Sequence, residues 1–178
     1  MRLLRRDRGP LIGNQRTSRG RVQSPLSISC PTRFASATLP IVSRLLEGTL
    51  DVTPVDVPKA VELLDSSPVR ARRVLERMPP GTIVVVENEI STRWLSRALG
   101  WADVRRGRAV VTADKLDASQ INSSERLAKL VAHEAGHLLG LRHCSSPSCL
   151  ARAIRSHAEL DALMGFCRRC RRRLERGR

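Results

Sequence analysis

Three histidines and one glutamate lie within one short stretch of the chain, where residues 133–144 read HEAGHLLGLRHC. On a helix, His133 and His137 are one turn apart, so their imidazole rings project from the same face and can hold one ion. Gly140 allows a sharp turn after the helix, which can return His143 to the same ion. Three imidazoles and one open position form the tetrahedral site of a catalytic zinc. The stretch therefore predicts that these three histidines bind zinc.

Glu134 directly follows the first of these histidines. It is rotated by about 100° around the helix, close enough for its carboxylate to reach a water on the ion. Zinc lowers the pKa of such a water toward about 7, and a carboxylate can then take its proton. We therefore expect Glu134 to act as a general base toward a water on the ion. The chain has no tyrosine, so stabilising an oxyanion is left to Arg142, to His157 or to the zinc alone.

A second group of possible ligands is formed by two cysteine pairs, Cys144 with Cys149 and Cys167 with Cys170. Four thiolates suit a closed structural zinc site, and four buried free thiols are the alternative. Cys144 directly follows His143, and neighbouring side chains on extended backbone point to opposite faces. His143 can therefore face one ion while Cys144 faces another. Because one tetrahedral site cannot use all these ligands, we expect two zinc ions, one catalytic and one structural.

The elements that position these ligands follow from apolar periodicity. Asn122 and Glu125 have the spacing of a capping box, and the predicted active-site helix runs from there to Gly140. Two β-branched runs, residues 82–86 and 109–112, predict strands, the first buried on both faces. Further helices are predicted over residues 39–46, 57–64, 67–78 and 90–99, the last closed by Gly100.

The 178 residues carry a net charge of +15 and are 41% hydrophobic, which suits one domain with a substantial core. Residues 1–40 contribute +7 of this charge and residues 167–178 contribute +6. Residues 1–36 are rich in Gly, Pro, Ser and Arg and predict a basic, disordered extension, in which Cys30 has no assigned role. We expect residues 37–178 to form the single domain. No apolar run suits a signal peptide or a membrane span, so we expect a cytoplasmic monomer without a membrane partner.

Residues 133–170 resemble the archaemetzincins, a family of metzincin-type zinc peptidases. The family is marked by a long HExxHxxGxxHC motif, a second Cys after four residues and a later C-x-x-C. Here these motifs read HEAGHLLGLRHC, SSPSC and FCRRC, and residues 127–134 and 158–161 are also similar. The resemblance implies an α+β, zincin-like fold. A mixed twisted sheet would back the active-site helix, substrate would run along an edge strand, and a four-cysteine zinc site would lie near the C-terminus.

The resemblance also implies roles for the individual residues. The three histidines would bind the catalytic zinc, Glu134 would be the general base, and the four cysteines would bind the second zinc. One position departs from the family. Ala151 stands where the family carries the Met of the Met-turn, beneath the catalytic metal, so the chain is a divergent member. Replacing a buried Met by Ala leaves a void that costs about 2–5 kcal/mol unless the surroundings collapse.

The alternative function is a catalytically weak or inactive zinc-binding module whose basic tails bind nucleic acid or a protein partner. The absent Met and the arginine-rich residues 168–178 favour this alternative, because arginines bind phosphates. The aromatic content of 2% speaks against base stacking. An intact Glu134 favours catalysis, since a purely structural zinc site gains nothing from it. A peptide or protein substrate is therefore the partner that we expect, with nucleic acid second.

Overall fold

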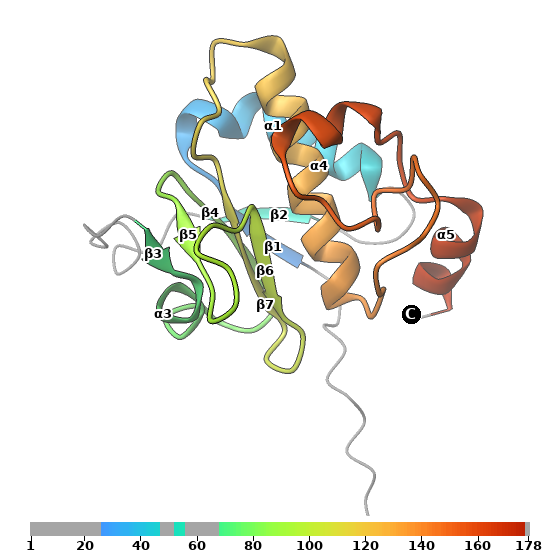
Figure 1. Cartoon of the computed structure of the whole chain (residues 1–178), viewed down its shortest axis with the longest axis horizontal. Coiled ribbons are helices and arrows are strands. Elements are labelled where there is room, and N and C mark those ends of the chain that lie inside the picture. Colours follow the sequence, from blue (N-terminus) through green and yellow to red (C-terminus); the bar gives the residue numbers. More distant parts are fainter. Residues whose placement is uncertain (1–25, 47–51, 56–67, 177–178) are drawn as a thin grey trace, which may run out of the picture.

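A five-stranded sheet runs through the computed structural model, which describes residues 26–46, 52–55 and 68–176 (Figure 1). The strands in spatial order are β2 (Val52–Val55), β1 (Leu26–Ser29), β4 (Thr82–Val86), β7 (Arg108–Thr112) and β6 (Gly100–Asp103). The first four are mutually parallel, and β6 pairs antiparallel with β7 at the edge. The mixed sheet implied by the resemblance is therefore confirmed.

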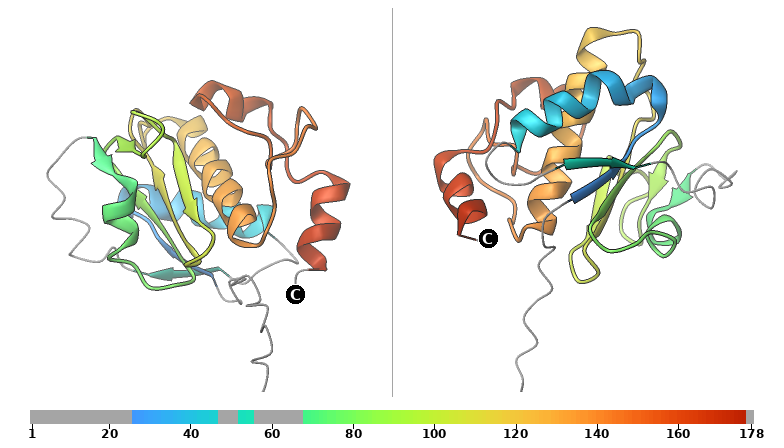
Figure 2. Two further views of the ribbon diagram at one scale, coloured as in Figure 1. Left: turned by 60° about the horizontal axis from the view of Figure 1, so that its bottom comes forward. Right: turned by 180° about the vertical axis from the view of Figure 1, so that it is seen from behind.

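Helices cover both faces of this sheet. α1 (Thr32–Leu45) and α4 (Ile121–Leu138) pack together against one face. The other face is covered by α3 (Ala71–Leu75), with the small parallel sheet of β3 (Val69–Arg70) and β5 (Ile90–Ser91) beside it. The C-terminal part joins the α4 side through the 3-10 helix η1 (His157–Ala162) and ends in α5 (Arg168–Glu175). Figure 2 shows α3 and α5 at opposite ends of the molecule.

β4 separates two hydrophobic cores. Ile83 and Val85 face the core shared with α1 and α4, and Val84 and Val86 face the core under α3. All five residues of the strand are buried, so the prediction of a strand covered on both faces is confirmed. The predicted strand at residues 109–112 is likewise confirmed as β7.

The ordered structure begins earlier in the sequence than the predicted boundary at residue 36. Leu26–Ser29 form a strand in the interior of the sheet, and α1 already starts at Thr32. Cys30, expected in a disordered extension, is buried instead. The strand was missed because its four residues offer only one pair of alternating apolar side chains, Leu26 and Ile28, within a polar segment. Residues 1–25 lie outside the described residues.

Two other predicted helices differ from the structure. Residues 90–99 contain β5 and a loop rather than a helix, and Gly100 begins β6 instead of closing a helix. In this loop the Thr92 hydroxyl accepts hydrogen bonds from the amides of Trp94 and Leu95, which stabilises a turn. The helix predicted at residues 67–78 shrinks to the five residues of α3, because Val69 pairs with Ile90 in the small sheet.

The active-site helix begins without the predicted capping box. Its N-cap is Gln120, whose side chain makes no capping hydrogen bond, and Asn122 lies within the first turn. Glu125 pairs with Lys129 one turn later, at 2.8 Å, instead of reaching back to the helix start. The end of the helix is as predicted, since Gly140 has a φ of +90°.

The remaining expectations about elements have mixed outcomes. Residues 39–45 are helical as predicted, although α1 extends further toward the N-terminus. The helix predicted at residues 57–64 lies outside the described residues. Among the described helices, none combines the length and apolar character that crossing a membrane requires.

Candidate active site and second metal centre

The imidazoles of His133 and His137 meet at the C-terminal end of α4. Their Nε2 atoms are 3.0 Å apart. Each ring is fixed from behind by its Nδ1 atom, which lies 2.6 Å from the carbonyl oxygen of Leu150 for His133 and 2.9 Å from that of Leu141 for His137. A carbonyl oxygen only accepts, so both Nδ1 atoms carry the proton and both Nε2 atoms present a lone pair.

Two facing lone pairs at this distance repel each other unless a cation lies between them. Nitrogen ligands of a tetrahedral zinc are about 3.3 Å apart, close to the observed separation. Burial lowers the pKa of His133 to about 4, with the neighbouring His137 adding to the effect, and burial also lowers the pKa of His137. Both rings are therefore held in the neutral form that binds metals.

His143 completes the group from the chain that follows the helix. The positive φ of Gly140 reverses the backbone after α4. His143 then returns so that its ligand atom and those of the two helical histidines all lie within 4.8 Å of one another. The structure thus brings together the three histidines that the sequence analysis selected, and their donor atoms fit a zinc ion.

Glu134 lies beside this group, buried between α4 and the edge strand. Its side chain is only 5% exposed, and burial raises the pKa of its carboxyl group to about 8. The carboxylate rests against the backbone of Gly100 in β6. A Cβ atom on Gly100 would lie 2.3 Å from Oε1 and 2.8 Å from Cδ of Glu134, so any side chain there would displace the carboxylate. The carboxylate of Glu134 therefore occupies the space that a side chain at position 100 would fill.

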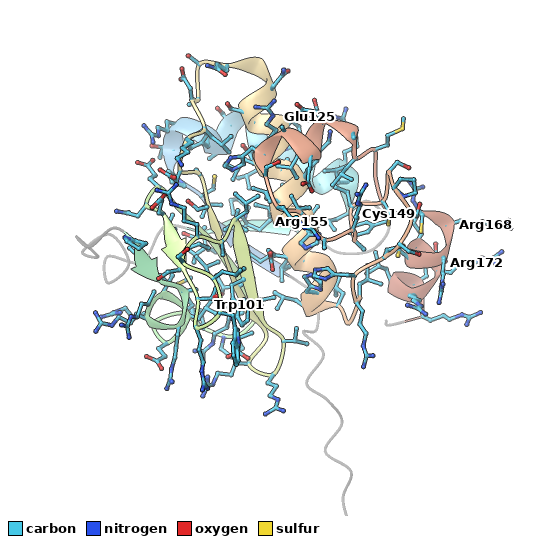
Figure 3. All side chains as sticks on the ribbon, in the orientation of Figure 1. Trp101, Glu125, Cys149, Arg155, Arg168 and Arg172 are labelled. Carbon is cyan, nitrogen blue, oxygen red and sulfur yellow. The ribbon has the colours of Figure 1, made fainter. Side chains whose placement is uncertain are left out.

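A cavity of about 680 Å³ opens over these residues. It is bounded by β6 on one side, by α4 beneath and by residues 153–157 on the other side, and it contains the three histidines and Glu134. Figure 3 labels Trp101 and Arg155, which come from the two opposing sides. His157 lines the cavity, and within the described structure its buried Nε2 atom has no hydrogen-bond partner. Arg142, the other proposed oxyanion stabiliser, is exposed and is not part of the lining.

The four cysteines of the second group also gather in one place, although they come from positions up to 26 residues apart. Their sulfur atoms lie within 4.8 Å of one another, and Cys144 and Cys167 are separated by 3.9 Å. Sulfur ligands of a tetrahedral zinc are about 3.8 Å apart. His143 and Cys144 belong to different groups, in agreement with the prediction that these neighbours face opposite ways.

The surroundings of the sulfurs favour thiolates unequally. The backbone amide of Cys170 points at the Cys167 sulfur and lowers the pKa of that thiol to about 7. Burial raises the pKa values of Cys149 and Cys170. Four thiolates this close together repel one another, so a cation is needed before all four can be deprotonated. The donor set therefore fits a structural zinc site.

Leu150 and Ala151 directly follow Cys149 of the second group and connect it to the first. Leu150, whose carbonyl oxygen holds His133, is fully buried, and Ala151 is 2% exposed. The Cys144 amide donates to the Ala151 carbonyl oxygen at 2.8 Å, which ties this segment to the second group. Met164 is 84% exposed and so does not fill the interior in place of the absent Met.

One stabilising contact of the active-site helix was missed by the sequence analysis. Lys129 is 6% exposed, and its Nζ atom donates to the Leu160 carbonyl oxygen of η1 at 3.1 Å. Beside it, Arg126 donates two hydrogen bonds to Asp161, of 2.8 and 2.6 Å. These contacts hold η1, and with it His157, against α4. The apolar pattern around Lys129 gave no signal of this role, because a lysine on a helix is normally exposed.

Comparison with known proteins agrees with this geometry. Residues 120–176, which contain both ligand groups, match the family model described as Peptidase family M54. The archaemetzincin of Pyrobaculum aerophilum is 28% identical over 156 residues, which cover 85% of this chain and 96% of that protein. The archaemetzincin of Archaeoglobus fulgidus is 33% identical over 101 residues, or 54% of this chain, and the matched part spans 62% of the length of that relative.

Solved structures show the same fold. The archaemetzincin of Methanopyrus kandleri aligns with a TM-score of 0.69 and 22% identity, covering 88% of this chain and 96% of that one. The Archaeoglobus fulgidus archaemetzincin, complexed with malonate, aligns with a TM-score of 0.68 and 24% identity. The alignment covers 83% of this chain and 98% of that one. The family-model match and the sequence relatives support an assignment to the archaemetzincin family, and the solved structures show the shared fold.

Proposed function

We propose that the protein is a zinc-dependent peptidase with its catalytic centre at His133, His137 and His143. The observation that carries this proposal is the pair of Nε2 lone pairs facing each other at 3.0 Å, with both Nδ1 protons committed to backbone carbonyls. Around a zinc ion both lone pairs become ligands, and the separation of the two atoms is close to that of neighbouring ligands in a tetrahedral site. A zinc ion held there would act as a Lewis acid on a peptide carbonyl and would lower the pKa of water.

Glu134 is proposed as the general base. Its carboxylate lies at the cavity beside the three histidines, and its burial keeps competing solvent away. In a peptide hydrolysis the carboxylate takes a proton from the attacking water and passes it to the leaving amine. The burial that raises the pKa of Glu134 suits this second task, whereas the first task needs the ionised carboxylate, which a zinc cation at the three histidines would favour.

The substrate is proposed to lie in extended form along β6. β6 is an edge strand of the five-stranded sheet, and it lines the cavity. The backbone groups on its outer side can therefore pair with a peptide. Backbone pairing binds peptides with little regard to their side chains, and it would carry the scissile bond past Glu134, which rests on Gly100 of the same strand.

We propose that a second zinc ion is bound by the four cysteines and has a structural role. No fifth ligand position is needed, so the site is closed to substrate. Its ligands join the chain after α4 to the start of α5, and all four lie in the same hydrophobic core as α4 or pack against it. Loss of this ion is expected to loosen residues 144–170, including Leu150, which holds His133.

The direct test replaces Glu134 by glutamine, which keeps the size of the side chain and removes the base. Hydrolysis of a fluorogenic peptide library is expected to fall by at least 100-fold, while zinc content stays at the wild-type level. Glu76→Gln is the matched control, since Glu76 is an exposed glutamate at the C-cap of α3 that pairs with Arg72 and lies outside the cavity. Unchanged turnover in Glu134→Gln would remove Glu134 from the reaction. A wild-type protein that is loaded with zinc but hydrolyses nothing would instead favour the inactive zinc-binding module.

A further inference from the structure

Five arginines lie along one side of α5, the last of them at the residue that caps its C-terminal end. We call this group the arginine stripe, and its members are Arg168, Arg169, Arg172, Arg173 and Arg176. At 100° per residue they fall within an arc of about 140°, and they span about 12 Å along the helix axis. All five are exposed, and Figure 3 shows the labelled Arg168 and Arg172 on the outer side of α5, at the edge of the molecule.

The opposite side of the same helix is fixed to the domain. Cys170 and Leu174 are each 3% exposed and belong to the main core, and Cys167 and Cys170 are members of the four-cysteine group. Arg171, which is not in the stripe, donates from Nε to the Phe166 carbonyl oxygen at 2.9 Å. The stripe is therefore presented on a helix whose orientation the fold determines.

The charge of the stripe is not compensated within the described part of the chain. Five arginines elsewhere pair with carboxylates: Arg33, Arg72, Arg97, Arg106 and Arg126. No arginine of the stripe forms an ion pair with any described residue, and residues 162–178 contain one acid, Glu175. Other described arginines, such as Arg44, Arg73 and Arg105, also lack a carboxylate partner, so what distinguishes the stripe is that five such charges lie together on one side of a helix. Five adjacent guanidinium groups repel one another, so their concentration here has a cost that a polyanionic partner would remove.

We propose that the arginine stripe binds the phosphate backbone of a nucleic acid without sequence preference, as an activity additional to the active site. Guanidinium groups donate paired hydrogen bonds to phosphate oxygens, and duplex DNA offers one phosphate charge per about 1.7 Å of axis. The stripe contains no Asn, Gln, Ser or Thr to recognise bases, and no aromatic residue on which bases could stack. These residues can contact phosphate but cannot distinguish one sequence from another.

Other polyanionic partners fit the stripe less well. Helices that bind membranes in this manner insert an apolar face between lipids, whereas the apolar residues of α5, Cys170 and Leu174, are buried in the core. Acidic protein surfaces rarely present carboxylates at the density and regularity of a phosphate backbone. The stripe offers charge only, which is what sequence-independent nucleic-acid binding uses.

The test is the salt dependence of binding to a fluorescently labelled 20-base-pair DNA duplex of scrambled sequence, measured by fluorescence anisotropy with the full-length, zinc-loaded protein. If all five arginines contact phosphate, the plot of log K against log salt has a slope of about −4.5, and affinity falls about 500-fold between 50 and 200 mM salt. Arg172→Ala/Arg173→Ala is expected to reduce the steepness of this slope by about 1.8.

The matched control is Arg73→Ala/Arg105→Ala, which removes two exposed arginines outside the stripe, one on α3 and one in the turn between β6 and β7. It should keep the wild-type slope, and Glu134→Gln should bind as the wild type does, because the proposal does not depend on hydrolysis. The proposal is overturned if the protein does not bind the duplex. It is also overturned if the slope of log K against log salt changes equally in the two double variants, because binding would then depend on the overall charge of the protein or on the N-terminal arginines. The same measurement is made with polyglutamate and with phosphatidylserine vesicles. If either binds as tightly as the DNA duplex, and Arg172→Ala/Arg173→Ala weakens its binding to the same extent, the choice of nucleic acid as the partner is overturned.

Discussion

Gly100→Ala is expected to displace the proposed general base while leaving the zinc ligands in place. The new Cβ atom would lie 2.3 Å from Oε1 of Glu134, and real Cβ atoms essentially never approach a neighbour closer than 3.0 Å. The carboxylate must therefore shift by about 0.7 Å or more, away from the edge strand. Gly100 does not have a positive φ, so the alanine adds no backbone strain of its own. A shift of this size in a catalytic group costs about 100-fold in rate.

The assay measures kcat and KM of Gly100→Ala on a fluorogenic peptide, with zinc content and thermal unfolding measured on the same preparation. We expect kcat to fall by about 100-fold with zinc retained, and the overpacking to lower the stability by about 1–3 kcal/mol. The Glu134→Ala variant lacks the carboxylate, so adding Gly100→Ala to that variant should lower its stability only slightly. A wild-type kcat, or an equal stability loss in both backgrounds, would refute the inferred contact between Gly100 and Glu134.

Two further substitutions test the parts of the structure that surround the site. Lys129→Met removes the charged donor to the buried Leu160 carbonyl oxygen, which keeps the Leu163 amide at 3.1 Å, and should lower the free energy of unfolding by about 1–3 kcal/mol. Arg126→Ala, which breaks an ion pair with the half-exposed Asp161, should cost no more than about 1 kcal/mol, and equal losses in urea titrations would contradict this ranking. His157→Ala should lower kcat by about 100-fold with little change in KM if the unpartnered Nε2 stabilises an oxyanion. Unchanged kcat in His157→Ala would leave that task to the zinc.

The ligand groups could be predicted from sequence because their spacing is local. His133 and His137 lie one helical turn apart, and Gly140 must supply the turn that returns His143. The alternation of His143 and Cys144 between the two groups also follows from backbone geometry alone. The buried strand β4 was equally visible, since five consecutive apolar and β-branched residues suit a strand covered on both faces.

Features that depend on contacts distant in sequence could not be predicted in the same way. Gly100 looks like a helix terminator in the sequence, and only the neighbouring Glu134 shows why it lacks a side chain. The carbonyl oxygens of Leu141 and Leu150 set the histidine tautomers, but every residue carries such a group, so no residue type marks them. β1 has too few residues to show a period, and it is stabilised by the two strands on either side of it.

The most direct test of the central claim is zinc K-edge X-ray absorption on the purified protein, combined with elemental analysis. The two proposed zinc sites predict about two zinc ions per chain. Nitrogen or oxygen ligands at about 2.0–2.1 Å and sulfur ligands at about 2.3 Å should be present in roughly equal numbers. One zinc per chain with sulfur ligands alone would contradict a zinc centre at His133, His137 and His143, and with it the proposed peptidase mechanism.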